Sequence, residues 1–179
     1  MYRVLVLDGA VIDVVRRGSP TVIGDGRSTV GELIEAENRR RLDAAGGLGL
    51  LLLLRTDLDC LRHLRDHGLG LRSVPELGRV LTVKTSSSES PPDDSETISA
   101  PLHPALAEDV QTAAQALGLR LAGVDLVTPS LARPLTESAG AIVEVNASPG
   151  LRYHYQMRDP QTATPVARQI LQPFLDDPA

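Results

Sequence analysis

The 179-residue sequence has few aromatic residues and a single cysteine. Aromatic residues make up only 2% of it, with one Phe, three Tyr and no Trp, so the hydrophobic core has to be built from Leu, Val, Ile and Ala. One cysteine, Cys60, excludes an internal disulfide, which is ordinary for a cytoplasmic protein. Because Cys60 lies in a leucine-rich helical pattern, we expect it to be buried as a small apolar residue rather than to act as a nucleophile.

The sequence also lacks a long apolar segment, an excess of basic residues and a secretory leader pattern. Its strongly apolar block, residues 48–54, is far shorter than the ~20 residues that span a bilayer, so it predicts a buried element. The formal net charge of −5 argues against nucleic acid as the main partner. Met1 leads directly into a strand-like run without a basic and then an apolar region. We therefore expect a cytoplasmic protein with no membrane or nucleic-acid partner.

Two apolar runs carry oxygen-bearing side chains. Asp125 lies near the end of residues 119–127, and Glu144 and Asn146 are two apart in residues 141–146, so the latter two share one face of a strand. If the two strands are neighbours in the sheet, the Asp125 carboxylate can lie beside the side chains of Glu144 and Asn146. A lone residue of this kind is most often a solvated turn residue, but here two strands converge. Two carboxylates and an amide oxygen suit Mg²⁺, which takes its remaining ligands from water and phosphates.

Regular elements are predicted along the rest of the chain. Asp8-Gly9 joins residues 2–7 and 11–15 in a hairpin, residues 19–23 and 80–84 are extended, and Thr29 with Glu32 forms a capping box. Four helices are expected, at residues 30–41, 57–67, 104–117 and 163–174. The apolar faces of the last three include Leu58, Leu61 and Leu64, then Leu106, Val110 and Leu117, and then Val166, Ile170, Leu171 and Phe174.

Several polar segments have two interpretations at this stage. Arg3 and Arg16 either protect an edge strand by their charge or face a phosphate group. The Gly-rich segment 24–27 is a plain turn or an anion site before a helix. His63 and His67 are spaced for a metal but lack a third ligand. Further segments are a flexible link at 44–49, a mobile loop at 85–95, and a loop at 151–156 that contacts substrate or only solvent.

Gly123-Val124-Asp125 together with Glu144-Val145-Asn146-Ala147-Ser148-Pro149-Gly150 resembles the C-terminal catalytic lobe of ATP-grasp carboxylate–amine ligases. The resemblance extends through most of the chain, and Gly24-Asp25-Gly26-Arg27 points to the cyanophycin synthetase branch. It implies an α/β fold with a mostly antiparallel sheet and packed helices. It also implies that residues 1–179 form a single lobe from which the N-terminal ATP-binding lobe is missing.

The resemblance further implies ligation of a carboxylate to an amine through an acyl phosphate, with ATP and Mg²⁺ as cofactors. Asp125, Glu144 and Asn146 would then hold the metal, and Arg3, Arg16 and Asn146 would contact the nucleotide. Arg3 and Lys84 would act on the transferred phosphate, although an ordinary strand-end role for Lys84 is equally open. The implied partners are ATP, an amino-acid or peptide substrate and the missing lobe; a homo-oligomer is left open.

The sequence departs from the family pattern in two places. ATP-grasp enzymes commonly hold ATP with two lysines and a glycine-rich lid, whereas Lys84 is the only lysine here. The loop at 85–95 lacks the Asn and the glycines of related ligases. We therefore expect this chain alone to be inactive. The alternatives to a partial ligase domain are a non-catalytic remnant or isolated lobe with weak or no nucleotide binding, and a related ligase that makes a Glu/Gln dipeptide.

Overall fold

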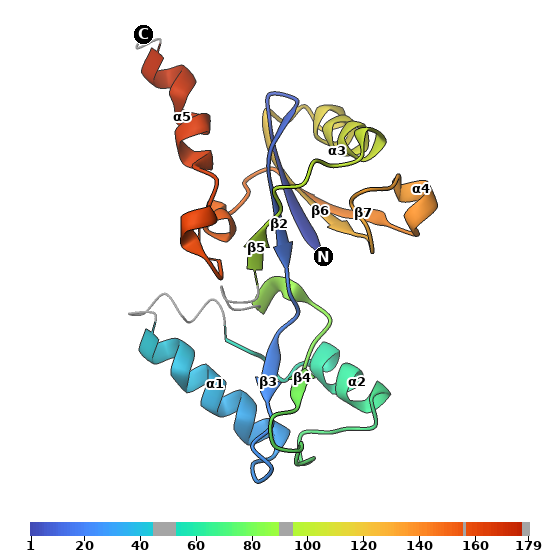
Figure 1. Ribbon diagram of the computed structural model, residues 1–179, viewed down its shortest axis with the longest axis vertical. Coiled ribbons are helices and arrows are strands. Elements are labelled where there is room, and N and C mark those ends of the chain that lie inside the picture. Colours follow the sequence, from blue (N-terminus) through green and yellow to red (C-terminus); the bar gives the residue numbers. More distant parts are fainter. Residues whose placement is uncertain (45–52, 90–94, 156, 177–179) are drawn as a thin grey trace. The chain divides into compact units, whose positions relative to one another are not determined.

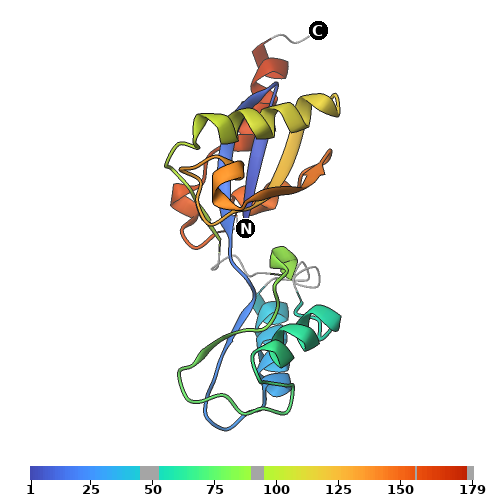
Figure 2. The same ribbon diagram turned by 90° about the vertical axis from the view of Figure 1, so that its right-hand side faces the viewer.

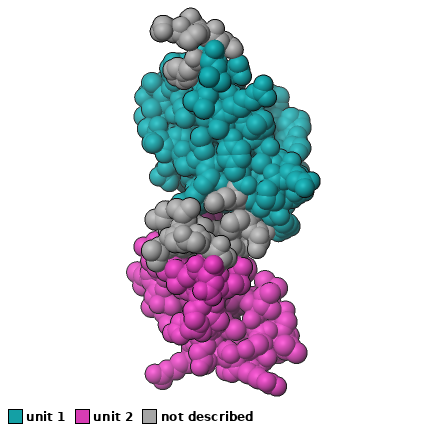
Figure 3. All heavy atoms as spheres, turned by 90° about the vertical axis from the view of Figure 1, so that its left-hand side faces the viewer, with its two compact units in different colours: residues 1–17, 95–179 teal, residues 18–94 magenta. Residues whose placement is uncertain are grey.

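The computed structural model describes residues 1–44, 53–89, 95–155 and 157–176. The chain divides into two compact units (Figure 3): unit 1 comprises Met1–Arg17 and Ser95–Ala179, and unit 2 comprises Gly18–Asp94. Each unit combines strands with helices, so the predicted α/β class is confirmed. Among the described residues, no helix is long and apolar enough to cross a membrane.

Unit 1 is built on a five-stranded sheet with the order β5-β2-β1-β6-β7, in which all neighbours are antiparallel (Figure 1). Its strands are β1 Tyr2–Leu7, β2 Ala10–Arg17, β5 Ser95–Thr97, β6 Leu121–Val127 and β7 Ala141–Asn146. The predicted hairpin is confirmed, because Asp8 and Gly9 both have positive φ angles, 48° and 79°, as a tight two-residue turn requires. The predicted pairing of β6 with β7 is also confirmed.

One face of this sheet packs against helix α3 Pro104–Ala116, which lies across the strands in Figure 2. The buried cluster at this face consists of Val4, Val6, Val14, Leu106, Val110, Ala114, Ala122, Val124 and Leu126. Side chains alternate along each strand, so the residues between these, such as Arg3 and Asp125, lie on the opposite face. That second face carries the candidate site.

The apolar faces of two unit 1 helices are shorter than predicted. Helix α3 ends at Ala116, and Leu117 is 59% exposed because it is the capping residue before Gly118, which has a φ of 66°. In helix α5 Val166–Asp176, Val166 is fully buried, whereas Leu171 is 53% exposed and does not dock on the core. The side chain of Phe174 lies outside the described residues.

Unit 2 contains a two-stranded antiparallel sheet and two helices. Its elements are β3 Thr21–Ile23, α1 Val30–Ala44, α2 Leu58–Asp66 and β4 Val80–Thr82. Its buried core is Val22, Val30, Ile34, Leu54, Cys60, Leu64, Leu81 and Val83, which confirms that Cys60 is buried. The capping box is confirmed, since the Thr29 amide donates to the Glu32 carboxylate at 2.8 Å and the Glu32 amide donates to Thr29 Oγ1 at 3.3 Å.

Helix α2 buries a different face from the predicted one. Leu64 is buried together with Cys60, one turn earlier, whereas Leu58 and Leu61 are 61% and 45% exposed. Asp57 caps the helix as predicted, accepting a hydrogen bond from the Cys60 amide. The predicted link at 44–49 and the apolar block at 48–54 fall mostly outside the described residues. The remaining short elements are η2 Ser87–Glu89, α4 Leu135–Ser138, η4 Leu151–His154 and η5 Pro160–Thr162.

Candidate functional site

The second face of the unit 1 sheet contains a buried ion pair between Arg3 and Asp125. The two residues lie opposite each other on β1 and β6. Arg3 Nε donates to one carboxylate oxygen of Asp125, and Nη2 donates to the other at 2.8 Å. Their side chains are only 6% and 2% exposed. Because both groups are shielded from water, this two-point contact fixes the orientation of each side chain.

Glu144 and Asn146 join this face from the edge strand β7. Glu144 lies opposite Asp125, and Asn146 lies opposite Gly123, so all three predicted oxygen ligands share one face of neighbouring strands. Glu144 is exposed. The Asn146 side-chain amide nitrogen donates to the Gly123 carbonyl oxygen at 3.2 Å, and a role of its side-chain oxygen as a metal ligand stays a prediction. No group of three or more His, Cys, Asp or Glu residues suited to a metal occurs in the described residues, so metal binding by Asp125, Glu144 and Asn146 stays a prediction.

Gly123 allows the two sequence motifs to approach each other. A Cβ atom at this position would lie 2.8 Å from the Cβ of Pro149 and 3.1 Å from Cδ of Arg3. Any side chain here would therefore collide with the turn that follows β7 or with the Arg3 stem. The absence of a side chain at Gly123 therefore leaves the room that Pro149 and the Arg3 side chain occupy.

Tyr153, in the η4 turn after β7, contacts three guanidinium groups. The guanidinium carbon of Arg17 lies 4.1 Å from the centre of the ring, that of Arg152 4.6 Å, and that of Arg3 5.6 Å. Arg152 Nη2 also donates to the Tyr153 hydroxyl at 2.6 Å. Distances below about 6 Å are typical of cation–π contacts. The described part of the segment 151–156, which had two interpretations from sequence, thus belongs to a basic cluster beside Asp125.

Arg17 is a member of this cluster that the sequence analysis did not select. It is buried, and burial lowers the pKa of its guanidinium, with the neighbouring charges of Arg3 and Arg152 acting in the same direction and those of Tyr153 and Asp125 opposing it. Val15 lies opposite Arg3, and Arg17 is two residues further along β2, so alternation puts Arg17 on the Arg3 face. The register of β2 shifts by one residue at a bulge opposite Leu5 and Val6; without it the Asp8-Gly9 turn would have put Arg16 on this face, so the sequence did not indicate Arg17.

Arg16, the neighbouring candidate, points to the other side of the sheet. It lies opposite Tyr2, which packs against the α3 core. Its Nε atom is 2.8 Å from the carboxylate of Glu96, and both side chains are partly exposed, at 46% and 38%. The structure therefore brings Arg3 and Asp125 together but not Arg16, whose contact with a nucleotide stays a prediction.

Asp13 on β2 anchors the chain that follows Tyr153. Its buried carboxylate is 2.5 Å from His154 Nδ1 and accepts a hydrogen bond from Thr164 Oγ1 at 2.7 Å. His154 is fully buried. These contacts join η4 and the residues just before α5 to the sheet, across 141 and 151 residues of sequence. No local pattern in the sequence indicated them.

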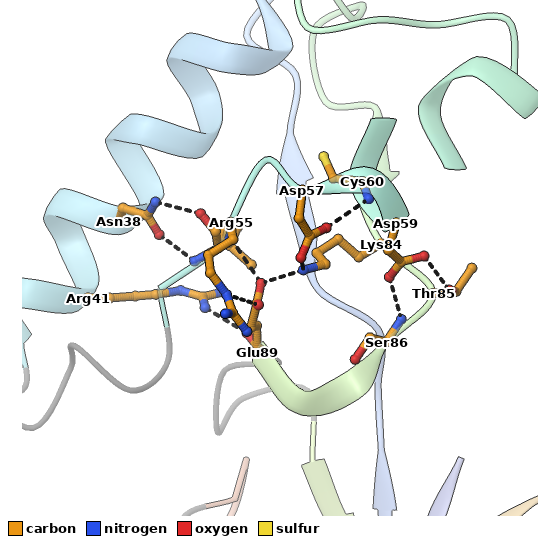
Figure 4. Close-up of polar contacts among 11 residues, drawn as sticks. Asn38, Arg41, Arg55, Asp57, Asp59, Cys60, Lys84, Thr85, Ser86 and Glu89 are labelled. Carbon is orange, nitrogen blue, oxygen red and sulfur yellow. Dashed lines mark hydrogen bonds and ion pairs between the residues drawn. The ribbon is translucent and has the colours of Figure 1, made fainter. Parts of the chain in front are cut away.

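Lys84, the remaining predicted catalytic residue, lies in unit 2 just after β4 ends. Its side chain is 2% exposed, and its ammonium donates to Asp57 Oδ2 at 2.7 Å and to Glu89 Oε2 at 2.9 Å (Figure 4). Burial opposes protonation, but these two carboxylates outweigh it and raise the pKa of Lys84. Because the other predicted site residues belong to unit 1, a role for Lys84 in phosphate transfer stays a prediction.

Glu89 is also held by Arg55 and Arg41. The Arg55 amide and Nε donate to its carboxylate at 3.0 and 2.8 Å, and Arg41 Nη1 donates to its carbonyl oxygen at 2.7 Å. Asp59 accepts hydrogen bonds from Thr85 and Ser86. The first part of the predicted mobile loop is therefore fixed by polar contacts, with η2 at Ser87–Glu89; residues 90–94 lie outside the described part of the chain.

Two weaker candidates have local explanations. The Asp25 carboxylate accepts hydrogen bonds from the amides of Arg27 and Ser28 and from the Ser28 hydroxyl, so the amides that an anion would use are occupied by the turn itself. His67 Nδ1 is 2.8 Å from the His63 carbonyl oxygen, and no third metal ligand accompanies the pair in the described structure.

Comparisons with known proteins give relatives that are much longer than this chain. No protein-family model matches it. The chain is 38% identical to a cyanophycin synthetase of Nostoc sp. over 86% of its own length, and 31% identical to that of Crocosphaera subtropica over 98%. It is 28% identical to the glutathione biosynthesis bifunctional protein GshAB of Clostridium perfringens over 86%. It spans only 17%, 20% and 20% of these proteins, that is, about a fifth of their length.

Among solved structures, a bifunctional glutathione synthetase from Pasteurella multocida matches 98% of this chain with a TM-score of 0.63 and 23% identity, covering 24% of that protein. The structural match shows the fold, and the sequence matches show homology to a segment of cyanophycin synthetases. The resemblance to ATP-grasp ligases and the predicted fold are therefore confirmed.

Proposed function

We propose that this chain is a partial catalytic domain of a cyanophycin synthetase-like, ATP-dependent carboxylate–amine ligase that acts through an acyl phosphate. The observation that carries the proposal is the buried Arg3–Asp125 pair on one face with Glu144 and Asn146. Its homologues support the same chemistry, since cyanophycin synthetases and glutathione biosynthesis proteins are both represented among them. ATP, Mg²⁺ and an amino-acid or peptide substrate are the proposed ligands.

The residues present fit a magnesium ion by their donor chemistry. Mg²⁺ prefers oxygen ligands, and two carboxylates and one amide oxygen occupy neighbouring positions on β6 and β7. Arg3 uses both oxygens of Asp125, but each carboxylate oxygen has a second lone pair that can bind a cation. Asp125, Glu144 and Asn146 would hold the ion, which when bound screens the charge of ATP phosphates.

The protein's own contribution would be positioning and electrostatic stabilisation. Asp125 orients the Arg3 guanidinium, so this group would stabilise negative charge on the phosphoryl group being transferred to the substrate carboxylate. Because Arg3 and Asp125 are shielded from water, their electrostatic effect on a bound ligand is larger than that of exposed groups. The amine substrate then attacks the acyl phosphate, a step that again depends on placement.

A second candidate function is that of an isolated lobe with weak or no nucleotide binding, and the ion pairs of Lys84 favour it. The only lysine of the chain has its ammonium bound by two carboxylates of unit 2. A ligase that makes a Glu/Gln dipeptide is a third candidate, supported by similarity to the GshAB proteins, at lower identity than the Nostoc cyanophycin synthetase.

Calorimetric titration with ATP at saturating Mg²⁺ tests the proposal. We expect binding that requires Mg²⁺ and that weakens at least about tenfold, or ~1.4 kcal/mol, in E144Q. E137Q makes the same change of charge at an exposed glutamate of α4 and should bind like the wild type. Absence of binding in all three proteins would reject nucleotide binding by this chain and favour the second candidate.

A further inference from the structure

Three arginines from three separate elements contact the Tyr153 ring. Arg3 comes from β1, Arg17 from the end of β2, and Arg152 from η4, next to the tyrosine itself. Their guanidinium carbons lie 4.1 to 5.6 Å from one ring centre. Asp125 pairs with Arg3. Several positive charges around one half-buried ring repel one another and lower the stability of the folded state unless the ring and an anion stabilise them.

Contact with an aromatic ring leaves the hydrogen-bonding capacity of an arginine intact. The N–H donors of a guanidinium lie in the plane of the group, whereas a ring is contacted through the face. Tyr153 contacts the three guanidinium groups through its ring, and its hydroxyl accepts a hydrogen bond from Arg152 at 2.6 Å. Guanidinium donors in a fixed fork match phosphoryl oxygens bidentately.

The position of Tyr153 is itself fixed by the neighbouring residue. His154 is fully buried and its Nδ1 is 2.5 Å from the Asp13 carboxylate on β2. The backbone of η4 is thus tied to the sheet one residue after Tyr153, while the hydroxyl of Tyr153 is tied to Arg152. The ring is held at both ends over the face that carries Asp125.

We propose that Tyr153 is a positioning residue that sets the spacing of Arg3, Arg17 and Arg152 for a ligand carrying phosphoryl groups. This inference rests on the proposed function and extends it to residues outside the predicted metal set. The ligand is either the phosphate chain of a nucleotide or another phosphoryl compound, and both present the same oxygens to the arginines.

The test compares Mg²⁺-ATP and Mg²⁺-tripolyphosphate binding by the wild type, Y153F, Y153L and the control Y155L, by calorimetry. Y153F keeps the ring and should bind tripolyphosphate within about threefold of the wild type, whereas Y153L loses the ring and should bind at least about tenfold more weakly. Tyr155 lies two residues away, and its hydroxyl accepts from the Ala167 amide at 2.7 Å, so Y155L should keep the affinity.

A spectroscopic measurement separates positioning from loss of folding. In the wild type and Y153F, the ring should displace the NMR signals of the Nε–H groups of Arg17 and Arg152, and Y153L should remove this displacement at an unchanged Tm. Should Y153L lower the Tm, R17K serves instead, because lysine keeps the charge without the planar group, and it should bind more weakly.

Equal tripolyphosphate affinity in the wild type and Y153L, or in the wild type and R17K, would overturn the inference, as would absence of tripolyphosphate binding by the wild type. Tyr153-dependent binding of tripolyphosphate without binding of ATP would support the inference and reject the nucleotide part of the proposed function. Tyr153-dependent binding of both ligands would support both.

Discussion

Asp125 and Arg3 lie opposite each other on neighbouring strands and form two hydrogen bonds, so the carboxylate expected to bind a cation already binds one that belongs to the protein. A metal at this position would therefore share Asp125 with Arg3. The pair also has a structural role, because both side chains are almost completely shielded from water on this face of the sheet.

Replacing Asp125 by Asn should destabilise unit 1 strongly. The D125N variant leaves the Arg3 guanidinium buried without its charged partner, which typically costs about 3–5 kcal/mol. Urea unfolding monitored by circular dichroism measures this loss. The control is E144Q, a change at an exposed carboxylate that should alter the unfolding midpoint little. Equal midpoints for D125N and the wild type would contradict the importance of the pair.

An alanine at Gly123 should also destabilise the fold, for a steric reason. Its Cβ would lie 2.8 Å from Pro149 Cβ and 3.1 Å from Arg3 Cδ, and overpacking of this kind costs about 1–3 kcal/mol. G150A is a matched control, because there the new Cβ would lie 3.9 Å from Tyr153 Cε2 and the φ angle of −69° suits alanine. Denaturant midpoints of the two variants should differ clearly; similar values would argue against close contact at Gly123.

The contribution of Glu89 to stability should disappear in acid. Burial acts to raise the pKa of Glu89, but hydrogen bonds from Arg55 and Lys84 outweigh it and lower the pKa below its ordinary value of 4.5. The folded state therefore favours the ionised carboxylate, and its stabilising effect is present above pH 4.5 and lost as the pH falls through the lowered value. The wild type should lose stability over this range.

The matching variants are E89Q and, as control, E35Q, which changes an exposed glutamate of α1. E89Q should be less stable than the wild type near pH 6, and the difference in free energy of unfolding should shrink toward pH 3. A difference that stays constant with pH would show that the charge of Glu89 does not stabilise unit 2.

Asp25 should titrate well below an ordinary aspartate. The hydroxyl and amide of Ser28 and the amide of Arg27 donate to its carboxylate and lower its pKa from 3.8 to about 2. The carboxyl carbon signal of Asp25, followed by NMR against pH, measures this value. S28A removes the hydroxyl donor and should raise the pKa, whereas S73A, at a serine that donates to no carboxylate in the described structure, should leave it unchanged.

Much of the fold followed from short-range patterns in the sequence. The Asp8-Gly9 turn, the Thr29–Glu32 capping box and the Asp57 cap each depend on residues at most four positions apart, and the structure confirms them. The exposure of Leu117 and Leu171 was not predicted, because the end of a helix and the length of its buried face depend on what packs against it.

The candidate site, too, was predictable from the sequence only in part. Alternation along β7 was enough to place Glu144 and Asn146 on one face, whereas the pairing of β6 with β7 brought Asp125 to them. A bulge between β1 and β2, which the sequence did not indicate, put Arg17 rather than Arg16 on the Arg3 face. The sequence by itself thus determined the class of the fold, its hairpin and its caps, because a strand repeats every two residues and a helix cap spans one turn. Metal binding by the oxygen-bearing side chains stays a prediction. Only the tertiary structure decided that Tyr153 contacts three arginines, that Asp13 holds His154 and that Lys84 is bound by Asp57 and Glu89. These contacts join side chains that folding brings together across long stretches of chain, and no local periodicity encodes them.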